Sequence, residues 1–150
     1  MTVYCQKVDF LPTVPPYFFK SYGDIVGGLR NCSPKLWRGG FGSFEATSEL
    51  YKFLEPYFNC PISVKYQVLK GDIGPHTDVC EQQFKYNYIY DLGGDSVTTK
   101  WWDLDTKAEV FSIECKLETW YKLNVKEFHS VEGTFRPRLS ITIKEIDVAQ

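Results

Sequence analysis

Alternating hydrophobic and polar residues dominate the chain from Pro61 onward. Ile62, Val64, Tyr66 and Val68 are separated by polar residues, which is the two-residue period of a strand with one buried face. Further segments rich in aromatic and β-branched residues follow at 84–92, 97–102, 110–115, 120–123, 128–131 and 138–143. About eight short strands separated by turns are typical of a β-sandwich or barrel.

The residues before this β-rich region have a different pattern. Four prolines between residues 12 and 34 divide the N-terminal third into short pieces. Leu50, Phe53, Leu54 and Tyr57 then follow the i, i+3, i+4, i+7 spacing of an amphipathic helix, and Pro56 marks its end. A helix early in a mostly β chain usually covers one face of a sheet.

Composition and charge narrow the class of protein. A length of 150 residues with 43% hydrophobic and 24% charged residues predicts one globular domain spanning 1–150, with its core at about 62–143. No apolar run approaches the ~20 residues of a membrane span, and no secretory signal opens the chain, so we expect a soluble, cytoplasmic protein. The net charge of −2 argues against a nucleic-acid partner. The five cysteines form no CxxC pair, which argues against a zinc ribbon.

The chain contains two histidines, and both are candidate metal ligands. His76 and Asp78 are two residues apart, so on a strand their side chains share one face. His129 lies on a later predicted strand. Two imidazoles and one carboxylate leave half of an octahedron open, which suits non-haem Fe(II). We therefore predict a metal site at His76, Asp78 and His129.

A second group of polar residues predicts an anion site beside this metal. Arg138 and Ser140 would share one face of the last strand, and a buried guanidinium is costly unless an anion pairs with it. The distal carboxylate of 2-oxoglutarate would be such a partner. Tyr66, on the inward face of its strand, is predicted to donate to the same carboxylate, and Asn87 is a further candidate for this site.

These residues resemble the signature of the Fe(II)/2-oxoglutarate-dependent oxygenase superfamily, which has an His-x-Asp pair, a distal His and an Arg near the last strand. The segments at 71–75 and 128–131 are similar to the prolyl-hydroxylase-like branch, and Trp101-Trp102-Asp103 to its compact bacterial and phage members. The alkylation-repair demethylase branch has a further Arg after this position, whereas here no Arg follows Arg138.

The resemblance implies a mainly β fold, a double-stranded β-helix (jelly-roll) with one or two N-terminal helices packed on the major sheet. It implies Fe(II), 2-oxoglutarate and O2 as cofactor and co-substrates, and hydroxylation of a C–H bond with decarboxylation to succinate. The substrate would be a protein or peptide side chain or a small molecule, and Trp101 is a candidate to contact it. The sequence carries no indication of oligomeric state.

Several alternatives stay open at this point. The metal could be zinc, or the chain could be a non-catalytic metal-binding β-barrel, such as a cupin-like sensor or scaffold. Arg138 could instead be a surface residue paired with Glu114 or Glu145. Trp101 could instead pack in the hydrophobic core or at the edge of a sheet.

Overall fold

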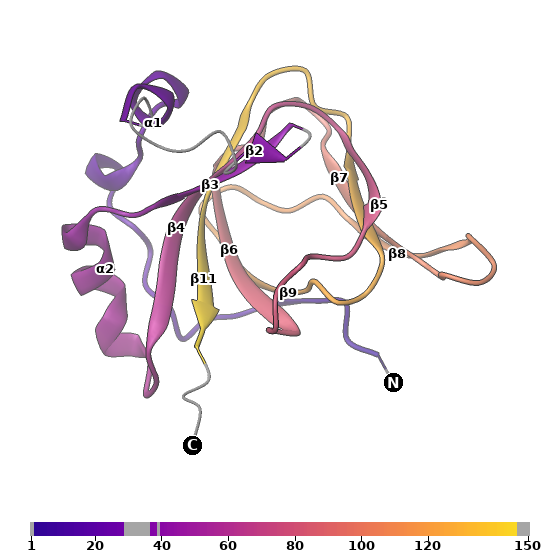
Figure 1. Ribbon diagram of the computed structural model, residues 1–150, viewed down its shortest axis with the longest axis horizontal. Helices are drawn as coiled ribbons and strands as arrows, with labels where there is room; N and C mark the ends of the chain where they lie inside the picture. The colour runs from indigo at the N-terminus through magenta and orange to yellow at the C-terminus, as the bar shows by residue number, and fades with distance from the viewer. Residues whose placement is uncertain (1, 29–36, 39, 147–150) are drawn as a thin grey trace.

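The computed structural model describes residues 2–28, 37–38 and 40–146, and its strands form two antiparallel sheets (Figure 1). The large sheet has the strand order β1-β9-β6-β11-β4-β3-β2, and the small sheet has the order β5-β10-β7-β8. The strands of the large sheet are β1 (Cys5–Lys7), β2 (Trp37–Arg38), β3 (Phe41–Glu45), β4 (Ile62–Leu69), β6 (Phe84–Asp91), β9 (Trp120–Asn124) and β11 (Arg138–Glu145). Those of the small sheet are β5 (Ile73–His76), β7 (Thr98–Trp102), β8 (Glu109–Ile113) and β10 (His129–Glu132).

From β4 onward the chain crosses repeatedly between the two sheets. β4, β6, β9 and β11 lie in the large sheet, and the strands between them in sequence lie in the small sheet. This winding of two facing antiparallel sheets is a double-stranded β-helix, or jelly-roll, and the predicted fold class is confirmed. The large sheet also contains β1, β2 and β3, which the sequence pattern did not predict.

The N-terminal third of the chain covers the outer face of the large sheet. It contains η1 (Pro16–Phe18), α1 (Tyr22–Gly28), α2 (Ser48–Leu54) and the short turn η4 (Glu55–Tyr57). The predicted helix is therefore present, although it tightens to a 3₁₀ turn at Pro56. Thr47 caps α2, because its hydroxyl accepts a hydrogen bond from the Leu50 backbone N–H at 3.3 Å.

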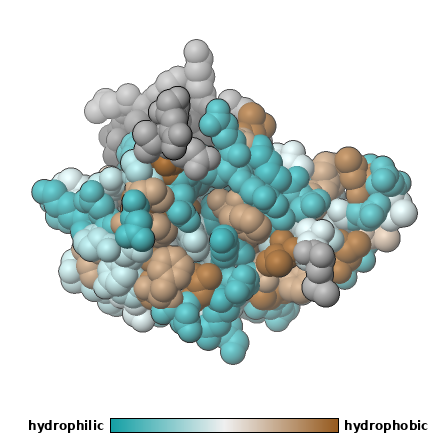
Figure 2. All heavy atoms as spheres, turned by 90° about the horizontal axis from the view of Figure 1, so that it is seen from below, coloured by the Kyte–Doolittle hydropathy of each residue, from teal (hydrophilic) through white to brown (hydrophobic). Residues whose placement is uncertain are grey.

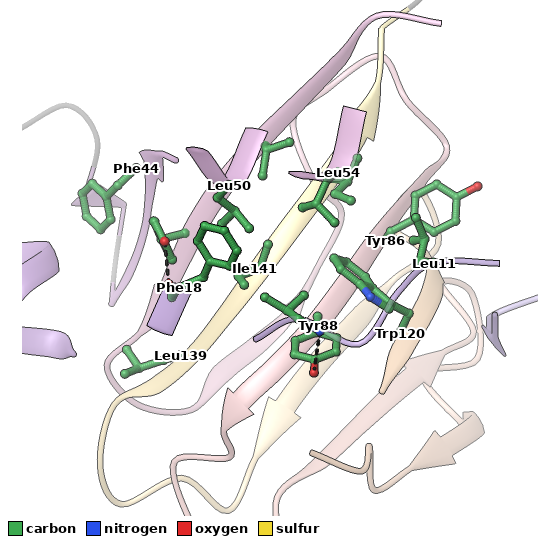
Figure 3. Close-up of a cluster of buried hydrophobic side chains, with 14 of the residues drawn as sticks. Leu11, Phe18, Phe44, Leu50, Leu54, Tyr86, Tyr88, Trp120, Leu139 and Ile141 are labelled. Atoms are coloured by element: carbon green, nitrogen blue, oxygen red, sulfur yellow. Dashed lines mark hydrogen bonds between the residues drawn. The ribbon is translucent and has the colours of Figure 1, made fainter. Parts of the chain in front are cut away.

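The main hydrophobic core lies between this N-terminal layer and the large sheet (Figure 3). Leu50 and Leu54 of α2 are fully buried against strand residues such as Ile141. The polar atoms of the large aromatic side chains are paired here. The Tyr88 hydroxyl accepts a hydrogen bond from the Val14 backbone N–H at 3.2 Å, for example. This layer therefore fixes the sheet on which the cleft described below is built.

Figure 2 shows one face of the surface, on which hydrophilic side chains are interspersed with several apolar groups. Among the described residues, no helix combines the length and the apolar character needed to span a membrane.

Candidate metal centre and adjoining cleft

His76, Asp78 and His129 converge at one point between the two sheets. His76 ends β5 and His129 begins β10, and the two residues are register partners on adjacent strands. Asp78 lies two residues beyond the end of β5, where its backbone N–H donates to the Val125 carbonyl at 2.9 Å. Asp78 Oδ1 is 3.4 Å from His76 Nε2 and 3.3 Å from His129 Nε2. One ligand atom from each residue lies within 4.8 Å of the others, so the three side chains could hold a metal ion.

Backbone carbonyls orient both imidazoles toward this point. His76 Nδ1 lies 2.8 Å from the Gly74 carbonyl oxygen, and His129 Nδ1 lies 2.8 Å from that of Glu127. A carbonyl oxygen only accepts, so each Nδ1 carries a proton, and each Nε2 presents a lone pair to a metal when the ring is neutral or donates to Asp78 when the ring is protonated. This arrangement is the usual outer support of a metal-binding histidine. The two rings are 4.4 Å apart between centroids and tilted by 49°.

Lys85 is a charged neighbour of the three residues that sequence reasoning missed. Its Nζ lies 3.4 Å from Asp78 Oδ2 and 3.3 Å from Gln67 Oε1. Burial by itself raises the pKa of Asp78, but the Lys85 ammonium and hydrogen bonds from both imidazoles outweigh it and hold that pKa well below its usual range. The hydrogen bond to Asp78 raises the pKa of His76. The carboxylate is thus ionised, as a metal ligand must be.

The three candidate ligands line a cleft between the two sheets. The volume of this cleft, including its open mouth, is about 560 Å³. Arg138 and Ser140, which alternation places on one face of the last strand, line this cleft, and so does the further candidate Asn87. Other lining residues, which sequence reasoning did not select, are Phe41, Gln67, Leu69, Ile73, Lys85, Thr99, Leu123 and Val131. The cleft combines an apolar wall with a small number of polar groups, as is typical of a small-molecule site.

Two polar atoms in the cleft have no hydrogen-bond partner in the described part of the chain. They are Arg138 Nε and Asn87 Oδ1, and both are buried. Burial lowers the pKa of Arg138, and the neighbouring sulfur of Cys115 acts in the opposite direction. Because buried polar atoms are nearly always hydrogen-bonded, the Arg138 Nε–H group indicates a ligand that supplies an acceptor.

The turn before β11 fixes the position of Arg138. Gly93 has a positive φ of 79°, and its carbonyl accepts the backbone N–H groups of Phe135 at 2.8 Å and Arg136 at 3.1 Å. A Cβ atom at residue 93 would lie 2.9 Å from Arg138 Cβ. Only glycine allows this close approach, so the turn that the sequence marks with Gly93 also positions the guanidinium.

The predicted position of Tyr66 is wrong. Its side chain lies on the outer face of the large sheet, within the main hydrophobic core, where its hydroxyl donates to the Phe18 carbonyl at 2.6 Å. The strand register explains the error, because Tyr66 pairs with Ile141 and therefore shares the apolar face. The opposite face of β4 lines the cleft, through Gln67 and Leu69.

The predicted substrate contact of Trp101 is also wrong. Its side chain is fully buried in a second hydrophobic cluster, and its indole N–H donates to the Asn124 carbonyl at 3.0 Å. Its ring centroid lies 6.1 Å from that of His129. Trp101 is therefore a core residue that packs beside a candidate ligand, which is the alternative that the sequence left open.

Comparisons with known proteins do not assign this chain to a family. No family model matches the chain, and no curated protein matches it. Among solved structures, recombinant pro-11S globulin of pumpkin is 17% identical with a TM-score of 0.49, over 81% of this chain and 30% of its own. Vicilin from Corylus avellana (hazelnut) is 11% identical with a TM-score of 0.49, over 78% and 32%. An oxalate decarboxylase of Bacillus subtilis is 15% identical with a TM-score of 0.47, over 81% and 30%. The chain thus spans about a third of these proteins, and such distant similarity says nothing of its activity.

Proposed function

We propose that this chain is an Fe(II)- and 2-oxoglutarate-dependent oxygenase that hydroxylates a C–H bond of a protein or peptide side chain or of a small molecule. One observation carries the proposal. Three side chains that could hold a metal line the same cleft as a buried guanidinium whose Nε has no partner among the residues that the structure describes. A site that only binds a metal has no need of such a cation, whereas a dicarboxylate chelating the metal would pair with it.

The residues present fit this metal and this co-substrate. His76, Asp78 and His129 would hold Fe(II) and leave ligand positions open, which suits this ion. Arg138, Ser140 and Asn87 would bind the distal carboxylate of 2-oxoglutarate. When bound, iron and 2-oxoglutarate supply the oxidising chemistry, in which dioxygen is consumed, succinate and carbon dioxide are released and an oxygen atom enters the substrate.

The protein's own part is to position and shield these groups. Lys85 pairs with Asp78 Oδ2, so that Oδ1 stays directed between the two imidazoles. The two histidine Nδ1–H groups are held by carbonyls, which keeps each Nε2 free to bind a metal. The apolar wall around Arg138, formed in part by Leu69 and Val131, excludes water and strengthens its pairing with a carboxylate.

The direct test is succinate formation by the purified protein supplied with Fe(II), 2-oxoglutarate and oxygen. We expect turnover, even without a hydroxylated substrate, and its loss when Fe(II) is omitted. Protein that binds Fe(II) but neither binds nor consumes 2-oxoglutarate would instead be a non-catalytic metal-binding barrel. Protein that binds neither would refute both functions.

A pair of arginine variants separates the anion site from general charge effects. Arg138→Gln should weaken 2-oxoglutarate binding about 100-fold, because a buried charge-assisted pair is lost, and should leave Fe(II) binding unchanged. Arg136→Gln is the matched control, since Arg136 is exposed and pairs with Asp91 at 3.1 Å. Isothermal titration of 2-oxoglutarate into metal-loaded, oxygen-free protein measures both. Equal affinities in the two variants would contradict the assignment of Arg138.

A further inference from the structure

A second hollow adjoins the candidate metal centre on the side away from Arg138. It shares His76, Asp78 and Lys85 with the cleft, and it extends along the inner face of β4 and β11. Its lining includes Lys65 and Lys144 in addition to Lys85. We call this hollow, defined by these three lysines, the lysine groove. The candidate metal ligands therefore lie at the junction of two spaces, of which only one is needed for 2-oxoglutarate.

The strand register places the three lysines on one face. Thr142 of β11 pairs with Lys65 of β4, and Lys144 is two residues further along β11 on the same face. Ile143 of β11 pairs with Tyr86 of β6 in antiparallel register. The next pair along the two strands is therefore Lys144 and Lys85, whose side chains lie on the opposite face of the sheet. Three adjacent strands thus direct one ammonium each toward the groove.

Carboxylates in the described part of the chain do not balance these charges. Lys85 is paired with Asp78, but that carboxylate is also a candidate ligand of a dication. Lys65 has a loose contact of 3.9 Å with Glu45, whose side chain is 81% exposed. Lys144 has no carboxylate within 4.0 Å among the residues described. The groove is thus locally cationic in a chain whose net charge is −2.

A cationic, half-enclosed groove attracts anions more strongly than the same charges on an open surface, because low-dielectric walls focus the field. The groove also offers hydroxyl donors, among them Ser43 and Ser63. Carboxylates and phosphates are the anions that lysines and hydroxyls bind together.

We propose that the substrate carries a carboxylate or phosphate group, and that Lys65 and Lys144 bind this group while the carbon to be oxidised faces the metal centre. This inference rests on the proposed oxygenase function and names the substrate class for it. Lys85 has a different role, since its ammonium already contacts Asp78, and we do not assign it to substrate recognition.

The test uses matched anionic and neutral probes on metal-loaded, 2-oxoglutarate-loaded protein. The probes are N-acetylaspartate with its diamide, and N-acetyl-O-phosphoserine amide with N-acetylserine amide. Titration calorimetry without oxygen measures binding, and succinate formation with oxygen measures stimulation of turnover. We expect the anionic member of at least one pair to bind about tenfold more tightly than its neutral counterpart, and the pair that responds distinguishes carboxylate from phosphate.

Charge-removing variants then locate the binding site. The double variant Lys65→Gln, Lys144→Gln should lose about tenfold in anion affinity, while its affinity for Fe(II) stays as in the wild type. Lys52→Gln, which removes an exposed lysine on α2, is the matched control and should change none of these.

Two outcomes would overturn the inference. One is that no anionic probe binds better than its neutral counterpart at millimolar concentration. The other is that the double variant binds anions as the wild type does. Failure of the oxygenase proposal looks different, because then 2-oxoglutarate is neither bound nor consumed, whether or not the lysine groove binds the probes.

Discussion

The two faces of the large sheet have opposite chemistry although both are buried. On the outer face, Val64, Tyr88 and Ile141 pack beneath the N-terminal layer. On the inner face of the same strands, Lys85 and Arg138 are nearly as inaccessible, at 7% and 6% exposure. Burying cations costs free energy that burying aliphatic groups does not. We therefore read the outer face as the source of stability and the inner face as the site of function.

Removing a candidate metal ligand from the inner side should have the largest effect on activity, with little effect on stability. His129→Ala should reduce 2-oxoglutarate turnover by at least about a thousandfold, since the remaining two side chains hold iron weakly. Its cost in unfolding free energy should stay within about 1.5 kcal/mol, because it removes the contacts with the Glu127 carbonyl and Asp78 but little apolar area, and Asp78 keeps Lys85 and His76 as partners. Succinate formation and urea unfolding of the metal-free protein measure the two effects. Turnover like that of the wild type would contradict the assignment of His129.

The outer face should show the reverse behaviour. Ile141 is fully buried, and Ile141→Ala should cost about 2–5 kcal/mol of unfolding free energy through lost transfer energy and the cavity left behind. Fe(II) affinity should be unchanged at temperatures where the variant is folded. Val110→Ala on β8 is the control, since Val110 is 44% exposed and should change stability by no more than about 0.5 kcal/mol.

Arg138 sharpens the comparison, because one substitution should separate function from stability. Arg138→Met should weaken 2-oxoglutarate binding about 100-fold. Without ligand it should leave the unfolding free energy unchanged or raise it by up to about 2 kcal/mol, since an apolar side chain replaces a buried cation whose Nε has no partner in the described part of the chain. Calorimetry and urea unfolding provide the two readouts. A loss of more than 2 kcal/mol would show that Arg138 has a structural role.

Much of the difference between the two faces could be predicted from the sequence. Where the prediction failed, the reason is physical. The candidate ligands were found because the chain has two histidines, one of them in an His-x-Asp pair at strand spacing. The two-residue period also separated the faces of β11, so that Arg138 and Ser140 were placed in the cleft. The period does not tell which face of a strand meets the helices, and this is why Tyr66 was placed wrongly.

Other features had weaker signals. Lys85 was missed because a lysine within a strand is usually solvent-exposed. Its pairing with Asp78, which lies outside that strand, becomes visible only in the structure. The strands β1 and β2 were missed because they have three and two residues, too few to show a clear alternation, and β3 because its five residues, FGSFE, include no β-branched residue. Pairing with longer strands, as between Phe44 and Tyr66, stabilises them instead.

Tyr66, which lies on the outer face, should give the smallest effect of the substitutions considered. Tyr66→Phe should cost about 1–2 kcal/mol of unfolding free energy, because the Phe18 carbonyl loses its donor inside the core. It should not change 2-oxoglutarate affinity, since the hydroxyl is on the face away from the cleft. Tyr90→Phe is the matched variant, because its hydroxyl donates to the Lys20 carbonyl at the same distance of 2.6 Å, and it should behave alike. A selective loss of 2-oxoglutarate binding in Tyr66→Phe would mean that the phenol reaches the co-substrate after all, and that the two faces of the sheet are not separate in function.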